Sequence, residues 1–140
     1  MVNDMDARQM AEVSGASPVR KLMVDDDGLI LMNSAEMLED MGYAVTSANS
    51  GAMALQMVSD GATFDLLITD FSMPRMDGVQ LAVAVRALLP DLPIILATGY
   101  ADLSANSELK LALLSKPYMQ SDLQGAINRT VPQVGSQVGS

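Results

Sequence analysis

The sequence contains no cysteine and no histidine among its 140 residues. Zinc fingers, cysteine nucleophiles and Ser-His-Asp hydrolases all depend on a thiolate or an imidazole, so these classes are excluded. Intrachain disulfides are excluded too, and a chain of this length buries enough surface in one core to fold without them. Any metal bound by the protein must therefore have oxygen ligands.

Basic residues are also scarce. Eight Lys and Arg residues stand against 17 Asp and Glu, for a net charge of -9. Such a charge repels phosphate backbones and anionic membranes. No apolar run approaches the roughly 18 residues of a membrane span, and residues 1–17 contain no signal-peptide core. We therefore expect a cytoplasmic protein that contacts neither nucleic acid nor membrane directly.

The remaining composition, 49% hydrophobic and 18% charged, is that of one globular domain. We assign this domain to residues 18–130. Residues 1–17 are expected to form a mobile N-terminal arm. Residues 131–140, which repeat Gln-Val-Gly-Ser, are expected to form a flexible tail.

Short apolar runs alternate with helical patterns along the domain. The runs, each of four residues, cover 21–24, 43–46, 66–69, 94–97 and 111–114. Most lack polar interruptions, which is typical of strands covered on both faces. Strands joined through helices predict a parallel α/β sheet with helices on both sides, and the more polar run 43–46 suits an edge.

Between the runs, apolar residues recur at helical spacing. Serines 50 and 121 are the expected N-caps of two helices, and Asp27 is the expected cap of the first. The expected apolar stripe of the helix after Ser50 consists of Ala52, Leu55 and Val58.

Polar residues follow the predicted strands at the edge where their carboxyl ends should meet. These residues are Asp25, Asp26 and Asp27 after the first run, then Asp70, Thr98 and Lys116. Clustered carboxylates recruit a divalent cation, and an all-oxygen set suits Mg²⁺. Asp70 could then attack phosphorus, while Lys116 and Thr98 supply charge and hydrogen bonds to the phosphoryl oxygens.

These residues lie in four motifs. The motifs are Leu-Met-Val-Asp-Asp-Asp at 22–27, Thr-Asp-Phe-Ser-Met-Pro-Arg-Met-Asp-Gly at 69–78, Ala-Thr-Gly at 97–99 and Ser-Lys-Pro-Tyr at 115–118. Over residues 19–130 the sequence resembles the receiver domains of bacterial two-component signalling, of the chemotaxis-regulator type. Each motif alone is weak evidence, but together and in this order they are specific.

The resemblance implies a flavodoxin-like three-layer α/β sandwich whose five parallel strands have the order 2-1-3-4-5. It implies that Asp70 accepts the phosphoryl group, that Thr98 senses it and that Lys116 pairs with it. It further implies a cis peptide bond before Pro117. The implied magnesium site comprises the acidic pair Asp25 and Asp26, together with Asp70 and the backbone carbonyl of Ser72.

Two features depart from the family pattern. Lys116 follows Thr98 by 18 positions, fewer than in chemotaxis-type receivers, so residues 101–110 should form a shortened or irregular fourth helix. Leu113 occupies the position where many receivers carry a switch aromatic. Tyr100 is an alternative shield for the acyl phosphate, or simply a half-buried loop aromatic.

The expected function is that of a signalling phosphoacceptor rather than an enzyme, with slow self-catalysed phosphotransfer and dephosphorylation. Its phosphodonor is expected to be a histidine kinase or a histidine phosphotransfer protein, docking on the helix at residues 29–41. The protein is expected to be a monomer or a weak dimer. Both a stand-alone regulator and the receiver of a hybrid histidine kinase stay open, the shortened helix favouring the latter.

Three other classes are weighed against this one. A haloacid-dehalogenase-like phosphohydrolase also uses Asp, Mg²⁺, Thr and Lys, but its nucleophile follows the first strand. An FMN-binding flavodoxin needs a phosphate-binding loop where this sequence has three acids. A phosphorylation-independent receiver-like module would not need the complete set of Asp26, Asp70, Thr98 and Lys116.

Overall fold

Strands and helices alternate through most of the chain in the computed structural model, which describes residues 20–99 and 111–130. In chain order the elements are β1 (Arg20–Val24), α2 (Gly28–Asp40), β2 (Ala44–Ala48), α3 (Gly51–Ser59), β3 (Leu66–Asp70), α4 (Gly78–Leu88), β4 (Ile94–Thr98), β5 (Ala112–Ser115) and α5 (Gln120–Thr130). The predicted arm, tail, fourth-helix region and Tyr100 lie outside the described residues.

The strands form one parallel sheet in the order β2-β1-β3-β4-β5, which confirms the order implied by the resemblance. Strands β3 and β4 are wholly buried, as their apolar runs predicted. Strand β2 lies at an edge, where Thr46 and Ser47 are exposed. The sheet register pairs Val24 with Thr69 and Thr98 with Ser115, so the carboxyl ends of the strands lie at one edge.

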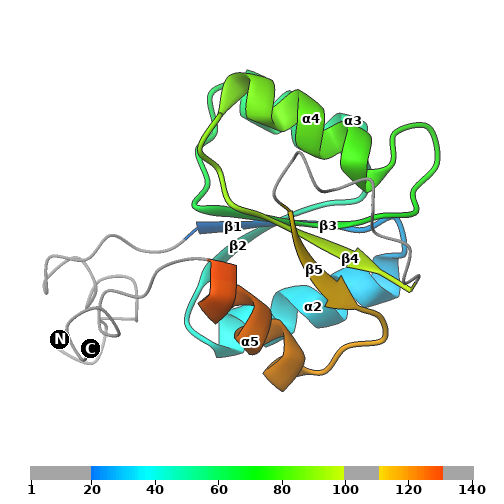
Figure 1. The fold of residues 1–140 in the computed structure, drawn as a ribbon, viewed down its shortest axis with the longest axis vertical. Coiled ribbons are helices and arrows are strands. Elements are labelled where there is room, and N and C mark those ends of the chain that lie inside the picture. Colours follow the sequence, from blue (N-terminus) through cyan, green and yellow to red (C-terminus); the bar gives the residue numbers. More distant parts are fainter. Residues whose placement is uncertain (1–19, 100–110, 131–140) are drawn as a thin grey trace, which may run out of the picture.

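Helices cover both faces of the sheet, with α3 and α4 on one side and α2 and α5 on the other (Figure 1). Each face has its own apolar core. The core under α3 and α4 includes Leu22, Leu67, Leu81, Val85 and Leu96. The core under α2 and α5 includes Met23, Leu38, Ile68, Leu123 and Ile127. Burial of these side chains supplies the main driving force for folding. The predicted three-layer sandwich is therefore confirmed.

Three helices begin at side-chain caps. The Asp27 carboxylate accepts hydrogen bonds from the backbone N–H groups of Leu29 and Ile30, and Ser50 caps Met53, as predicted. A reciprocal capping box between Asp77 and Gln80, which was not predicted, starts α4. These bonds satisfy N–H groups that have no partner within the helix.

Two helix predictions were wrong. Ser121 is not a cap, because α5 already begins at Gln120 and the Asp122 carboxylate accepts from the backbone N–H of Met119. In α3, Ala52 is exposed and Ala54 is buried instead. The helix is rotated so that Gly51 lies inward, which sets the buried positions at 51, 54 and 58.

Two strand boundaries also differ from the predicted runs. Strand β2 starts at Ala44 rather than Tyr43, because the backbone N–H of Tyr43 donates to Leu38 at the end of α2. It extends to Ala48, since an edge strand tolerates polar residues. Strand β5 covers Ala112–Ser115 rather than 111–114, as its ladder pairs Ala112 with Ile95. Among the described residues, no helix has the length and apolar character that crossing a membrane requires.

Candidate functional site

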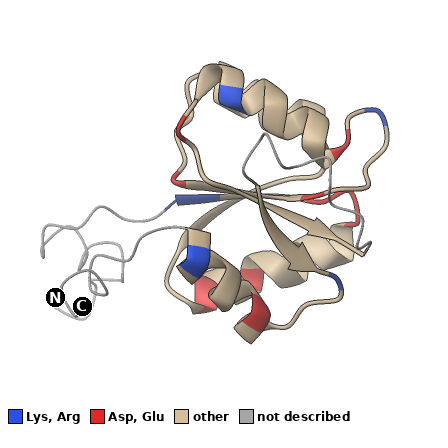
Figure 2. Cartoon of the chain, viewed as in Figure 1, with Lys and Arg blue, Asp and Glu red and all other residues tan. Residues whose placement is uncertain are grey.

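The predicted site residues lie together at the carboxyl edge of the sheet. Asp25 and Asp26 follow β1, Asp70 and Thr98 are the last residues of β3 and β4, and Lys116 follows β5. Figure 2 shows acidic segments at this edge, and further ones elsewhere on the molecule. Parallel register explains the grouping, because every strand delivers its carboxyl end to the same side.

Three carboxylates form the acidic cluster of the site. Asp25, Asp26 and Asp70 each offer one oxygen, and these atoms lie within 4.8 Å of one another. Asp25 and Asp70 are buried, whereas Asp26 is exposed. Hard oxygen ligands at this spacing match the coordination preference of Mg²⁺. The cluster could therefore hold a divalent cation, which would offset the mutual repulsion of the carboxylates.

Lys116 bridges two members of this cluster. Its Nζ atom lies 3.0 Å from Oδ1 of Asp70 and 3.2 Å from Oδ2 of Asp25. The other oxygen of Asp25 accepts the backbone N–H of Asp27 at 2.9 Å. Because both oxygens of Asp25 are engaged, the more accessible ligand for a cation is the exposed carboxylate of Asp26.

The electrostatics of the site follow from burial and crowding. Burial raises the pKa of Asp70, and the charges of Asp25 and Asp26 raise it further, against the opposing hydrogen bond from Lys116. Burial alone would lower the pKa of Lys116. The hydrogen bond to Asp70 and the neighbouring negative charges outweigh burial, so this pKa is raised. Lys116 therefore remains charged at neutral pH.

Thr98 and Ser72 occupy different environments. Thr98 is buried, and its backbone carbonyl accepts the N–H of Lys116 at 2.9 Å, which continues the β4–β5 ladder up to the lysine. Ser72 is exposed in the loop after β3, two residues beyond Asp70. The roles assigned to the Thr98 hydroxyl and the Ser72 carbonyl stay predictions. The Lys116–Pro117 peptide bond is cis, as the resemblance implied.

The loop after Asp70 is held by contacts that the sequence analysis did not identify. The backbone N–H of Phe71 donates to Ala97, and that of Gly78 donates to Phe71, each at 2.8 Å. At Gly78 an added Cβ would lie within 2.4 Å of the carbonyl oxygen of Asp70. The Met-Asp-Gly sequence was the available signal for this requirement, since glycine allows the closest backbone approach.

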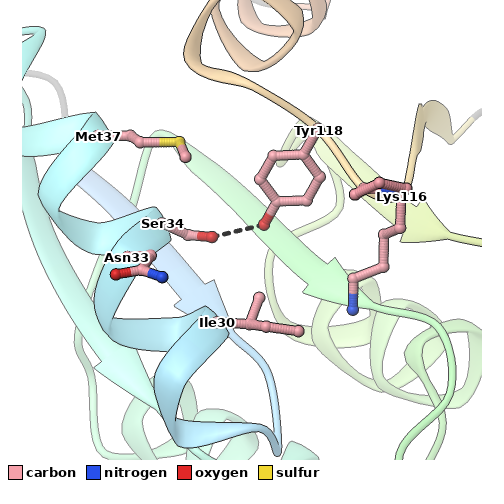
Figure 3. A pocket seen from close by; sticks show the side chains of 7 residues that line it. Ile30, Asn33, Ser34, Met37, Lys116 and Tyr118 are labelled. Atoms are coloured by element: carbon pink, nitrogen blue, oxygen red, sulfur yellow. Dashed lines mark hydrogen bonds between the residues drawn. The ribbon is translucent and has the colours of Figure 1, made fainter.

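A pocket of about 370 Å³ adjoins the site (Figure 3). One wall is α2, through Ile30, Ser34 and Met37, and the other wall contains Lys116 and Tyr118. The hydroxyl groups of Ser34 and Tyr118 share a hydrogen bond of 2.6 Å across it. No sequence pattern predicts this contact, because its partners are 84 positions apart.

Comparison with known proteins identifies the same type of domain. The family model of the response regulator receiver domain matches residues 22–128. The response regulator receiver protein CpdR of Brucella abortus (strain 2308) is 35% identical over 114 residues, which span 79% of this chain and 94% of CpdR. The sensor kinase CckA of the same strain is 32% identical over 117 residues, which span 80% of this chain and 12% of the kinase.

Solved structures give the same result. The chemotaxis protein CheY4 of Vibrio cholerae matches with a TM-score of 0.76 and 28% identity, covering 82% of this chain and 100% of CheY4. A CheY-like receiver domain protein from Methanospirillum hungatei JF-1 matches with a TM-score of 0.75 and 32% identity, covering 81% and 93%. The chain has the CheY-like flavodoxin fold and belongs to the response regulator receiver domain family.

Proposed function

We propose that this receiver domain accepts a phosphoryl group from a phosphohistidine onto Asp70 and thereby switches its interactions with a partner. The observation that carries the proposal is the contact of 3.0 Å between Lys116 and Asp70, made within a cluster of two further carboxylates. A buried aspartate with a fixed cation beside it has the charge environment that phosphoryl transfer needs.

The transfer would use the carboxylate of Asp70 as nucleophile. Its Oδ1 atom accepts Lys116, and among the described residues its second oxygen accepts no hydrogen bond. That oxygen attacks phosphorus, a P–O bond forms, and the P–N bond to the donor imidazole breaks with its electron pair leaving on nitrogen. Later attack of water on phosphorus releases inorganic phosphate and restores the carboxylate.

Asp26 and Asp70, with the Ser72 carbonyl, are the residues we assign to hold Mg²⁺, and Asp25 completes the acidic pair. The ion would neutralise charge on the transferring phosphoryl oxygens. Lys116, at the carboxyl end of β5, supplies a second, permanent positive charge. The Thr98 hydroxyl is assigned to bind a phosphoryl oxygen once the acyl phosphate has formed.

The phosphodonor, a histidine kinase or a phosphotransfer protein, is proposed to dock beside the site on α2. Leu29 and Met32 of α2 and Met119 before α5 are large apolar side chains that are more than half exposed. Exposed apolar side chains next to a reactive group favour docking of another protein. In-line transfer requires the donor histidine to approach Asp70 from this rim.

Labelling with a small phosphodonor tests the chemistry. Incubation with ³²P-labelled acetyl phosphate and Mg²⁺ should label the protein, and Asp70→Asn should abolish the label. Asp60→Asn is the matched control, since it removes the same charge at the end of α3 and should leave labelling intact. Labelling that survives Asp70→Asn would overturn the assignment of the phosphoacceptor.

The magnesium assignment has its own test. Asp26→Asn should raise the Mg²⁺ concentration needed for half-maximal labelling by about tenfold, because one charged ligand becomes neutral. Asp60→Asn should not change this midpoint. An unchanged midpoint in Asp26→Asn would remove Asp26 from the metal site while leaving Asp70 as phosphoacceptor.

A further inference from the structure

We propose that Ser34 and Tyr118 are positioning residues for Lys116. Their hydrogen bond ties the segment after β5 to α2 and so holds the Lys116 ammonium on Asp70. The inference rests on the proposed function of Asp70 and adds to it two residues that line the pocket beside Lys116.

The first observation is the placement of Ser34. This side chain is buried in the interior of α2, where serine is an unfavourable choice because its hydroxyl competes for backbone hydrogen bonds. A buried hydroxyl without a partner is costly. Tyr118 supplies the partner at 2.6 Å, across the pocket shown in Figure 3. The contact with Tyr118 therefore satisfies a buried hydroxyl that apolar packing does not require.

The second observation is that the Lys116 side chain is held only at its two ends. Its backbone is held to β4 through Thr98, and its Nζ atom contacts two carboxylates. Between these two ends the flexible side chain lines the pocket of about 370 Å³. Lysine loses up to about 2 kcal/mol of rotamer freedom when it is held in one geometry. An open pocket beside the chain gives it room to leave that geometry.

The contacts form a closed path around the site. Lys116 binds Asp25, and Asp25 accepts the backbone N–H that precedes α2. Helix α2 then leads to Ser34, which binds Tyr118, two positions after Lys116. Because the path closes, a shift of the segment after β5 relative to α2 must break either the hydroxyl contact or the lysine contacts. Ser34 and Tyr118 therefore restrict the position of the ammonium without touching the reacting atoms.

The hydrogen bond between Ser34 and Tyr118 persists at neutral pH. Burial raises the pKa of Tyr118, against the opposing hydrogen bond from Ser34, so the phenol stays neutral and retains its proton at neutral pH. A neutral phenol and a neutral hydroxyl can exchange the roles of donor and acceptor, which keeps the contact available in either arrangement.

Three variants test the role of the hydrogen bond between Ser34 and Tyr118. The quantity measured is the rate of phosphorylation by acetyl phosphate with saturating Mg²⁺. Tyr118→Phe and Ser34→Ala each remove one hydroxyl and keep the rest of the side chain. Each should slow phosphorylation by about tenfold, because the cation would no longer be held at the reacting carboxylate. The double variant should be no slower than the slower single variant, since both remove the same contact.

Tyr43→Phe is the matched control, because the Tyr43 hydroxyl also accepts a bond, from Gln124, on the same helical layer but away from the site. It should leave the rate unchanged. The rates are compared under conditions in which urea unfolding shows every variant to be fully folded, which separates positioning from a loss of stability.

The mobility of the Lys116 side chain, measured by NMR relaxation of its ¹³Cε signal at pH 7, gives a second readout. Loosening of the contacts with Asp25 and Asp70 should increase this mobility in Tyr118→Phe and Ser34→Ala, and should not do so in Tyr43→Phe. Unchanged rates in both variants, or unchanged mobility of Lys116 in both, would overturn the inference. If the unsubstituted protein is not labelled at Asp70, the proposed function fails instead.

Discussion

The surroundings of two lysines at opposite ends of the sheet shift their pKa values in opposite directions. Lys116 lies among carboxylates, and its pKa is raised. Lys21 on β1 is fully buried, and its Nζ atom has no hydrogen-bond partner within residues 20–99 and 111–130. The Nζ atom lies 4.1 Å from the ring centroid of Tyr43, a cation–π contact. Burial lowers the pKa of Lys21 to about 8, despite the attraction of Asp65.

This lysine makes stability depend on pH. The unfolded chain binds the Lys21 proton up to about pH 10.5, whereas the folded protein releases it above about pH 8. The unfolded state therefore holds more protons between these values, and the free energy of unfolding rises with pH across this window. Below pH 8 the folded protein carries the buried charge of Lys21, so the loss of stability that this charge causes is fully present.

We expect Lys21→Met to raise the free energy of unfolding at pH 7 by about 2 kcal/mol, since a buried charge is replaced by an apolar side chain of similar length. The gain should shrink as the pH rises from 8 towards 10.5. Urea unfolding at pH 7, 9 and 10 measures both effects. Arg20→Met, which alters the exposed neighbour, should show no such trend. A gain that is constant with pH would contradict the role of the charge.

At the scale of elements, the connection between β3 and α4 positions Asp70, the proposed phosphoacceptor. It contains Arg75 with a positive φ of 71°, and its Met76 packs against the start of α3 at Gly51. The capping box of Asp77 and Gln80 then starts α4. Because Gly78 lies against the carbonyl of Asp70, the first turn of α4 is packed directly on the end of the strand that carries Asp70.

Gly78→Ala should lower the free energy of unfolding by about 3 kcal/mol, because its Cβ would meet backbone that cannot move aside. It should also slow labelling of Asp70 by displacing the strand end. Gly28→Ala is the matched control, as nothing lies within 4 Å of its added Cβ and alanine favours the helix. Chemical unfolding and the acetyl phosphate assay measure the two effects. Equal behaviour of both variants would refute the close-packing argument.

At the scale of the whole molecule, the outcome of phosphorylation depends on which face responds. Strand β5 forms one edge of the sheet, and its Leu113 packs against the core under α3 and α4. An aliphatic side chain has no ring to rotate between an exposed and a buried position. We therefore expect that phosphorylation does not drive strong dimerisation through the β5 edge.

Sedimentation with and without beryllofluoride, a mimic of the acyl phosphate, measures this expectation. A monomer or weak dimer should persist in both conditions. Leu113→Tyr, which introduces a ring at this position, is an informative comparison, because any gain in association would identify the ring as the missing element. A tight dimer in the unsubstituted protein that substitutions on β5 disrupt would contradict the expectation.

The architecture and the residues at the strand ends could be read from the chain because both are local properties. Apolar runs and helical spacing repeat over a few residues, and a parallel sheet brings every strand end to one edge. Asp25, Asp26, Asp70, Thr98 and Lys116 are therefore predicted to lie together, and the sheet register shows that the strand ends do meet. The local pattern predicted the wrong cap for α5, because the Asp122 carboxylate, and not Ser121, bonds the backbone where this helix begins.

Contacts between distant segments depended on the folded arrangement. The sequence treats Asp25 and Asp26 alike, yet folding buries the first against Lys116 and exposes the second. The 84 positions between Ser34 and Tyr118 carry no periodic signal, because their meeting depends on how α2 and α5 pack on one face of the sheet. The chemistry of a strand end is thus encoded locally, whereas its accessibility and support arise only when layers pack together.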